Sequence, residues 1–80
     1  MIRLTKHAAE ALEKRNLAFD WIERALAAPD FTKPDPNDPT LTRSFKAIDE
    51  AGGRILRVVH RPERNDIVIA TAHFDRDAGP

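Results

Sequence analysis

The first hydrophobic pattern in the chain has the period of an α-helix. At about 100° of rotation per residue, one stripe of residues 6–15 collects its small and apolar side chains: Ala8, Ala11 and Leu12. Thr5 comes directly before this segment, and a threonine hydroxyl in that position can accept a hydrogen from an amide of the first helical turn. The pattern therefore predicts a helix over residues 6–15 that is capped by Thr5 and packs its apolar stripe against the core.

A second segment with the same period follows after a short break. Its apolar side chains also share one stripe: Trp21, Ile22, Ala25 and Leu26. Pro29 ends the segment because proline cannot continue a helix. Asn16 can end the preceding helix because asparagine tolerates the left-handed backbone conformation. The two patterns predict helices over residues 6–15 and 19–28 that form a tight helical hairpin.

Three later segments alternate apolar and polar side chains with the period of two that is typical of strands. They cover residues 41–48, 54–60 and 66–74. Residues 29–40 contain four prolines and are expected to form a surface loop or an extended edge. Residues 1–4 are a candidate for one more short strand. The order (β)ααβββ predicts an α+β domain in which the helical hairpin packs on an antiparallel sheet of three to four strands.

The lengths of the turns decide which strand residues face the helices. If residues 61–65 form the whole turn between the last two strands, Arg57 faces Ile69. The helices then cover one set of side chains: Leu56, Val58, Val68, Ala70, Ala72 and Phe74. The opposite face carries Arg43, Arg57 and His73 together with four aliphatic side chains: Ile55, Val59, Ile67 and Ile69. No third helix follows to cover this face, so we expect a homodimer contact or a partner to bury it, unless the proline-rich segment folds back over it.

Composition narrows the class of protein. Eighty residues are enough for one domain with one modest core, and the chain has no cysteine. No apolar run approaches the roughly 20 residues of a membrane span, so we expect a cytoplasmic protein with no membrane partner. The net charge is zero, although residues 43–64 carry six lysines or arginines against three acidic residues. A dedicated nucleic-acid binder usually carries more positive charge than this.

Several short motifs, taken in order, resemble one bacterial family. They are LTKHA and EKRNL at the two ends of the first helix, WIERAL in the second, and RILRVVH and IVIATAHF in the last two strands. Over residues 3–75 the chain resembles a small family catalogued as a domain of unknown function, which is similar to the RelE/ParE- and BrnT-type toxins of toxin–antitoxin pairs. The resemblance implies a RelE/BrnT toxin-like fold, a metal-independent endoribonuclease of the mRNA-interferase kind, and an antitoxin protein as partner. Two features depart from the family: Asn16 replaces its usual glycine, and the chain is neutral where such toxins are basic.

The candidate catalytic residues are His7, Arg57 and His73. A ribonuclease that uses no metal needs a proton acceptor for the 2′-hydroxyl, and histidine titrates in the right range. His7 matches the histidine in the first helix of the family, and we expect its side chain to approach the sheet. Arg57 would stabilise the negative charge of the reacting phosphate. The structural alternatives are a histidine that packs in the first helical turn and an arginine that pairs with a helix carboxylate such as Glu10.

The candidate RNA-binding residues are the other cations that could surround this site: Arg15, Arg43, Lys46, Arg61 and Arg64. The structural alternative for Arg15 is a cation favoured at the end of a helix. Phe45 could stack on a base, or it could belong to the core. The chain has no glycine-rich phosphate loop, and His60 and His73 fall at opposite ends of the predicted hairpin, so we predict no metal site and no cofactor.

Two functions from different classes therefore remain. The first is a toxin-like domain that cleaves RNA, and the alternative is a non-catalytic module of the same fold that dimerises or binds a small partner protein. The surroundings of Arg57 distinguish them. An open basic groove favours RNA, whereas an arginine that is paired and covered favours the binding module.

Overall fold

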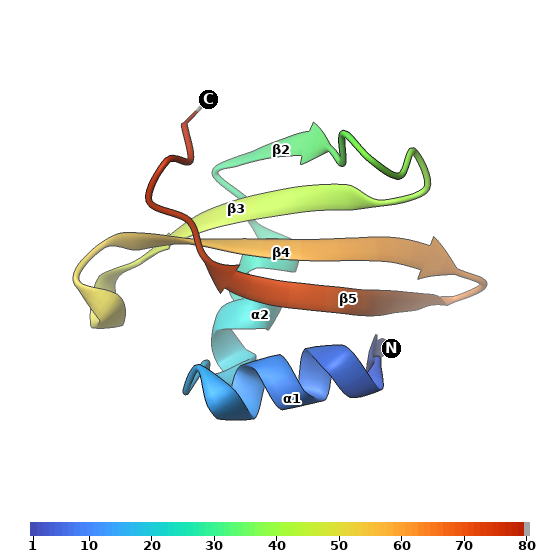
Figure 1. Ribbon diagram of the computed structural model, residues 1–80, viewed down its shortest axis with the longest axis horizontal. Helices are drawn as coiled ribbons and strands as arrows, with labels where there is room; N and C mark the ends of the chain where they lie inside the picture. The colour runs from blue at the N-terminus through green and yellow to red at the C-terminus, as the bar shows by residue number, and fades with distance from the viewer. Residues whose placement is uncertain (80) are drawn as a thin grey trace.

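The structure, a computed structural model, describes residues 1–79 and contains one five-stranded sheet with two helices (Figure 1). The elements in chain order are β1 (Ile2–Leu4), α1 (Lys6–Lys14), α2 (Phe19–Ala27), β2 (Phe31–Pro34), β3 (Thr42–Ile48), a 3-10 turn (Asp49–Ala51), β4 (Arg54–Glu63) and β5 (Asp66–Phe74). The strand order is β1-β5-β4-β3-β2, and β1 runs parallel to β5 while the other neighbours are antiparallel. Figure 1 views the sheet from the face opposite α2, which we call the open face. The predicted α+β architecture is confirmed, but the sheet is mixed and has five strands instead of three or four antiparallel ones.

Both predicted helices are present, and the first begins as expected. The hydroxyl of Thr5 accepts a hydrogen bond from the Ala8 amide at 3.1 Å and donates one to the Ala70 carbonyl at 3.2 Å. This one side chain therefore caps α1 and also attaches it to β5. Asn16 has a positive φ of 54°, which ends the helix and returns Leu17 to the core.

The helices cover one face of the sheet with the predicted stripes. The buried core on this side comprises Ala8, Leu12, Leu17, Ile22, Ala25, Ile48, Leu56, Val58, Ile69 and Ala72. Trp21 and Leu26 pack against this core but remain partly exposed, so burial on α2 centres on Ile22 and Ala25.

The proline-rich segment supplies the strand that the sequence left undecided. β2 pairs with β3, and it places Phe31 opposite Phe45 and Lys33 opposite Arg43. The extended edge is thus confirmed for residues 31–34. Proline at the end of this strand is tolerated because β2 is an edge strand, where a missing amide hydrogen breaks no ladder.

The predicted turn between the last two strands is too long. Glu63 pairs with Asp66, so the hairpin closes over two residues, Arg64 and Asn65, and Arg64 takes the positive φ of 57° that such a tight turn needs. Pro62 stays in β4 because β3 ends opposite His60, beyond which β4 is paired on one side only. The predicted pairing of Arg57 with Ile69 is therefore wrong.

A β-bulge in β5 also corrects the predicted faces. Val59 pairs with Thr71 and the next residue, His60, pairs with Ile69, so Ala70 is left without a partner on β4. The extra residue reverses the alternation of β5. Ile67 and Ile69 face the helices, whereas Thr71 and His73 lie on the open face.

The corrected register removes the reason for which a homodimer was expected. Of the four aliphatic residues assigned to the open face, only Ile55 and Val59 lie there. Val59 is just 5% exposed in the isolated chain, and Ile55 is only partly exposed. The open face therefore has no broad exposed patch of aliphatic side chains that needs a second chain to cover it.

Ile22 is the larger of the two fully buried side chains of α2, the other being Ala25, and should determine how firmly this helix is held. The substitution Ile22→Ala is expected to lower the free energy of unfolding by about 2–5 kcal/mol, because it removes buried methyl groups and leaves a cavity. Urea unfolding followed by circular dichroism measures this loss. Glu23→Ala, at the next and exposed position of α2, is the control and should shift the free energy by no more than about 0.5 kcal/mol. Equal midpoints for the two variants would show that α2 does not pack through Ile22.

Candidate functional site

One row of side chains crosses the open face over four strands. The backbone pairings place Phe31 of β2 opposite Phe45 of β3, Phe45 opposite Arg57 of β4, and Arg57 opposite His73 of β5. Because directly opposed residues project to the same side of a sheet, these four side chains lie next to one another. The row brings two of the candidate catalytic residues, Arg57 and His73, into direct contact.

Arg57 is held at the centre of this row by two polar contacts. Its Nη2 donates a hydrogen bond to Nε2 of His73 at 2.5 Å, and its Nη1 lies 3.2 Å from Oδ2 of Asp75. The side chains of Arg57 and Asp75 are each 19% exposed. The carboxylate that pairs with Arg57 is thus Asp75 at the end of β5, and not Glu10 of α1. This paired and partly covered arginine is the arrangement expected of the binding module.

The third nitrogen of the guanidinium has no partner. Nε of Arg57 is buried and forms no hydrogen bond within residues 1–79. A buried donor of this kind costs free energy that the rest of the structure must offset. The Arg57 guanidinium is therefore less well satisfied than its ion pair alone suggests.

The surroundings of His73 hold its imidazole in the neutral form. Burial of the ring is the largest cause that lowers the pKa of His73 below its usual value of 6.5. The adjacent charge of Arg57 lowers this pKa further, the cations of Arg15 and Arg43 act in the same direction, and Asp75 opposes them. Because Nε2 accepts the hydrogen from Arg57, the ring proton lies on Nδ1. His73 is therefore a neutral base at pH 7.

At the aromatic end of the row two phenylalanine rings stack on each other, and the sequence analysis singled out only one of them, Phe45. The rings of Phe31 and Phe45 stack at 4.5 Å between centroids and 14° between planes. Phe45 is buried beneath Phe31, and Lys33 places its ammonium group 5.7 Å from the Phe31 ring. Phe31 is thus the aromatic side chain that a ligand on this face could reach. Its alternation with Lys33 in a proline-rich segment was the only sequence signal for it.

The candidate RNA-binding cations are not gathered into one groove. Arg43 lies on the open face in the next row and pairs with Asp35 at 3.2 Å, and Arg61 lies further along β4 and pairs with Glu63 at 3.0 Å. Arg64 lies in the two-residue turn at the far end of the hairpin, and Arg15 forms the exposed C-cap of α1.

Lys46 and His7 do not belong to this site. Lys46 pairs opposite Leu56 on the helix-covered face, where its Nζ lies 3.4 Å from Asp30, because alternation along β3 sends it away from Phe45. His7 is exposed on α1 and makes no side-chain hydrogen bond within residues 1–79, so the expectation that it approaches the sheet is wrong. One residue is about 100° around a helix, and this rotation carries His7 off the stripe that Ala8 buries.

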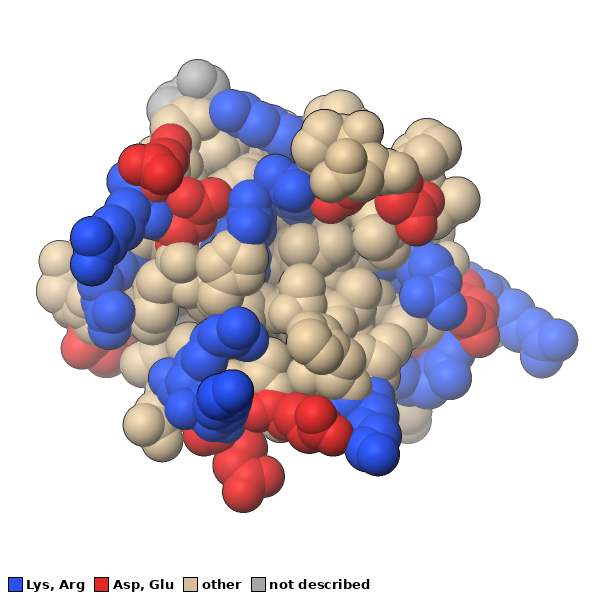
Figure 2. Space-filling view, viewed as in Figure 1, with Lys and Arg blue, Asp and Glu red and all other residues tan. Residues whose placement is uncertain are grey.

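The surface charge of the open face is mixed. Figure 2 shows uncharged side chains at the centre of this face, with lysines and arginines interspersed with acidic side chains around its rim. Neighbouring carboxylates pair with Arg43, Arg57 and Arg61. No continuous basic groove crosses the described part of the chain on this side.

The third histidine lies on the other face, close to the core. His60 Nε2 is 2.7 Å from Oγ of Ser44, and burial lowers the pKa of His60. This pair satisfies two polar groups beneath the helices. No group of three or more histidine, cysteine or acidic side chains within residues 1–79 is placed to hold a metal ion.

One protein family matches this chain. The family model for a domain of unknown function, DUF4258, matches residues 4–74. The chain belongs to this family. The match includes every residue of the row across the open face and ends just before Asp75, so the carboxylate that pairs with Arg57 lies outside it. No curated protein and no solved structure matches this DUF4258 domain. None of its helices within the described residues is long and apolar enough to cross a membrane.

The neutral state of His73 predicts how the stability of this DUF4258 domain depends on pH. The pKa of His73 is lower in the folded chain than in the unfolded chain, so the unfolded chain takes up the proton first as the pH falls. The contribution of His73 to the free energy of unfolding is therefore fully present above pH 6.5 and is expected to be lost as the pH falls below that value. Urea unfolding at a series of pH values measures this slope. Because burial also lowers the pKa of His60, His73→Gln should make the slope shallower without removing it, whereas His7→Gln, at an exposed position, should leave it unchanged; equal slopes in all three proteins would contradict the prediction.

Proposed function

We propose that this domain cleaves RNA on its open face, with Arg57 and His73 as the catalytic pair. The observation that carries the proposal is the contact between a guanidinium and a neutral imidazole in a partly exposed row of the open face. A guanidinium can bind a phosphate through charge-assisted hydrogen bonds, and a neutral histidine can accept a proton at pH 7. The partly exposed ring of Phe31, stacked on Phe45 in the same row, offers a surface for a base.

The energetics of the pair also support a functional role. Burial of the ring and, after it, the adjacent charge of Arg57 lower the pKa of His73, which weakens stability at acidic pH. The same guanidinium leaves its Nε buried without a partner. A pair kept only for stability would be expected to avoid both costs, and clusters of this kind are concentrated at functional sites.

The arrangement supports a cleavage step in which the 2′-hydroxyl of RNA is the nucleophile. A phosphate bound at Arg57 would draw the Nη2 donor away from His73 and free its Nε2 lone pair. Nε2 then accepts the proton of the 2′-hydroxyl as the bond from the 2′-oxygen to phosphorus forms and the bond from phosphorus to the 5′-oxygen breaks. The 5′-oxygen takes a proton from water, and the products are a 2′,3′-cyclic phosphate and a 5′-hydroxyl. Arg57 stabilises the charge that develops on the phosphate oxygens.

The resemblance to RelE/ParE- and BrnT-type toxins agrees with this chemistry. It extends the proposal to a messenger RNA as substrate, an antitoxin protein as partner and the cytoplasm as the location. Part of the open face would then be covered by the antitoxin when the domain is inactive.

A second candidate function is the non-catalytic binding module. The paired and partly covered Arg57, together with the lack of a continuous basic groove within residues 1–79, meets the criterion given above for this module. Asp75 and Asp35 neutralise Arg57 and Arg43, which leaves a face of uncharged side chains and paired charges. Such a mixture is typical of protein–protein interfaces. The simplest form of this module is a homodimer, and sedimentation equilibrium tests it. A homodimer that Phe31→Ser dissociates would support the module, and a monomer at high concentration would exclude the homodimer.

Cleavage of a short RNA by the purified chain tests the leading proposal. The wild-type protein is expected to release fragments with 2′,3′-cyclic phosphate ends and to leave a 2′-O-methyl RNA of the same sequence intact. Arg57→Gln and His73→Gln should each lower the rate by a factor of about 10²–10⁴, the range typical of a lost general base or charge stabiliser. Since the pKa of His73 is lowered, the rate should rise with pH below 6.5 and level off above it.

Two matched control variants help to distinguish cleavage by this chain from cleavage by a contaminating nuclease. His7→Gln and Arg64→Gln change the same residue types at exposed positions away from the row and should cleave as the wild type does. Cleavage that survives both Arg57→Gln and His73→Gln would show that the pair is not catalytic. If the chain binds RNA without cutting it, the ribonuclease proposal is wrong and RNA binding remains.

A further inference from the structure

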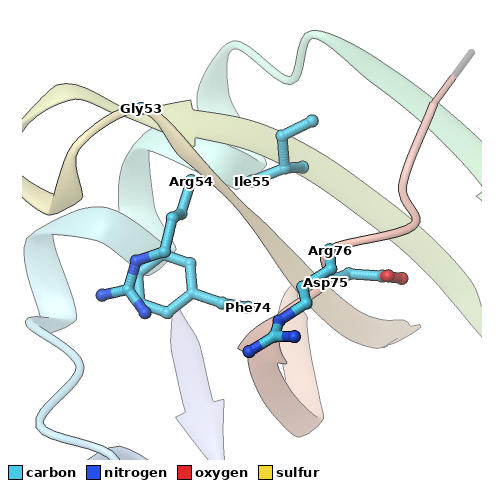
Figure 3. A pocket seen from close by; sticks show the side chains of 6 residues that line it. All are labelled: Gly53, Arg54, Ile55, Phe74, Asp75 and Arg76. Carbon is cyan, nitrogen blue, oxygen red and sulfur yellow. The ribbon is translucent and has the colours of Figure 1, made fainter.

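A cavity lies at the end of the sheet where β4 begins and β5 ends. It has a volume of about 530 Å³ and is lined by Gly53, Arg54, Ile55, Phe74, Asp75 and Arg76 (Figure 3). The hydrogen bond from the Asp75 amide to the Ile55 carbonyl, at 2.9 Å, holds the chain after β5 beside β4 at this point. The cavity is therefore framed by ordered backbone on two sides.

Arg54 is oriented in this cavity by uncharged groups. Its Nε donates a hydrogen bond to the Ala51 carbonyl at 3.1 Å, and its guanidinium carbon lies 4.0 Å from the centroid of the Phe74 ring. Trp21 contacts the Phe74 ring at 6.0 Å between centroids and so fixes its position. A guanidinium stacked in this way loses little freedom on binding and keeps its terminal Nη donors for a ligand.

Neither arginine of the cavity is neutralised by a carboxylate within residues 1–79, which is also true of Arg15 and Arg64 outside it. Five arginines of the chain form ion pairs with carboxylates: Arg3, Arg24, Arg43, Arg57 and Arg61. Arg54 and Arg76 form no ion pair within residues 1–79. The one carboxylate of the lining, Asp75, directs Oδ2 to Arg57 and accepts a hydrogen bond from the Asp77 amide at Oδ1. In Figure 3 this carboxylate points away from Arg54.

We propose that this cavity binds a phosphate group, with Arg54 as the oriented bidentate donor and Arg76 as the second cation. Arginine pairs with phosphate through two parallel hydrogen bonds, and the stacked Arg54 presents its terminal nitrogens in that geometry. Two sources share this chemistry: a backbone phosphate of RNA and a free phosphate or mononucleotide. Asp75 lines the cavity and also contacts Arg57, whereas Arg54 pairs opposite Ile48 and so lies toward the helix-covered side of the sheet. An RNA strand that passes from the open face around this end of the sheet would place a neighbouring phosphate here. That assignment of the source, unlike the phosphate site itself, rests on the proposed function.

Amide chemical shifts of the full chain, measured during titration with inorganic phosphate, test the site. We expect saturable shifts at the amides of residues 53–54 and 75–76. Arg54→Gln and Arg76→Gln should each weaken phosphate binding by about tenfold, while Arg64→Gln, an exposed arginine in the β4–β5 turn, should not change it. Because Arg54 also packs on Phe74, Arg76→Gln serves as the variant that leaves the fold untouched. Shifts that are absent, or that persist unchanged in both variants, would overturn the site.

A second arm with uncleavable 2′-O-methyl RNA distinguishes the two sources. If the source is RNA, the oligonucleotide should compete with inorganic phosphate, and Arg76→Gln should weaken its binding by about tenfold. If phosphate binds here and the RNA does not compete, the site takes a free phosphate and the assignment to RNA fails. A chain that cleaves RNA but binds no phosphate in this cavity would refute the inference alone, and a chain that binds phosphate but cleaves no RNA would refute the proposed function alone.

Discussion

The β-bulge at Ala70 is the constraint on which both faces of the sheet depend. Regular alternation would put Ile67, Ile69, Thr71 and His73 on one side of β5. The extra residue turns Ile67 and Ile69 toward the helices and leaves Thr71 and His73 on the open face. A single unpaired residue thus completes the hydrophobic core and sets His73 opposite Arg57. The Thr5 hydroxyl donates its hydrogen bond to the carbonyl of this same residue, so the start of α1 is attached to the bulge.

The open face combines opposing electrostatic effects within one row. The ion pair with Asp75 steadies Arg57, while the contact with His73 joins a guanidinium to an imidazole that burial already keeps neutral. A phosphate would relieve this arrangement, because it offers Arg57 a second anionic partner and releases the nitrogen of His73. In the proposed function, the geometry that lowers the pKa of His73 would also prepare the pair for an anionic ligand.

A chain with no net charge can still offer unpaired arginines to a ligand at particular places, because ion pairs neutralise most of the arginines on its sheet. Most arginines along the sheet are matched by carboxylates from neighbouring strands and turns, which keeps the broad surface free of a strong positive field. Arg54 and Arg76 have no such partner within residues 1–79, at one end of the sheet beside the carboxylate that pairs with Arg57. In the proposed phosphate site, recognition would depend on these two guanidinium groups rather than on the net charge, which is zero.

The local elements of this protein follow from its sequence. The helical stripes, the Thr5 cap and the left-handed Asn16 all depend on the spacing of residues close to one another in the chain. The tertiary structure alone decided the pairing of β4 with β5. A turn of two residues and a bulge of one are small local choices, yet each one shifts a whole strand relative to its partner. For the same reason the contact of Arg57 with His73, the stacking of Phe31 on Phe45 and the pairing of Arg57 with Asp75 were beyond the sequence. They join residues from different strands, and which side chains meet is fixed only when the core has selected one register.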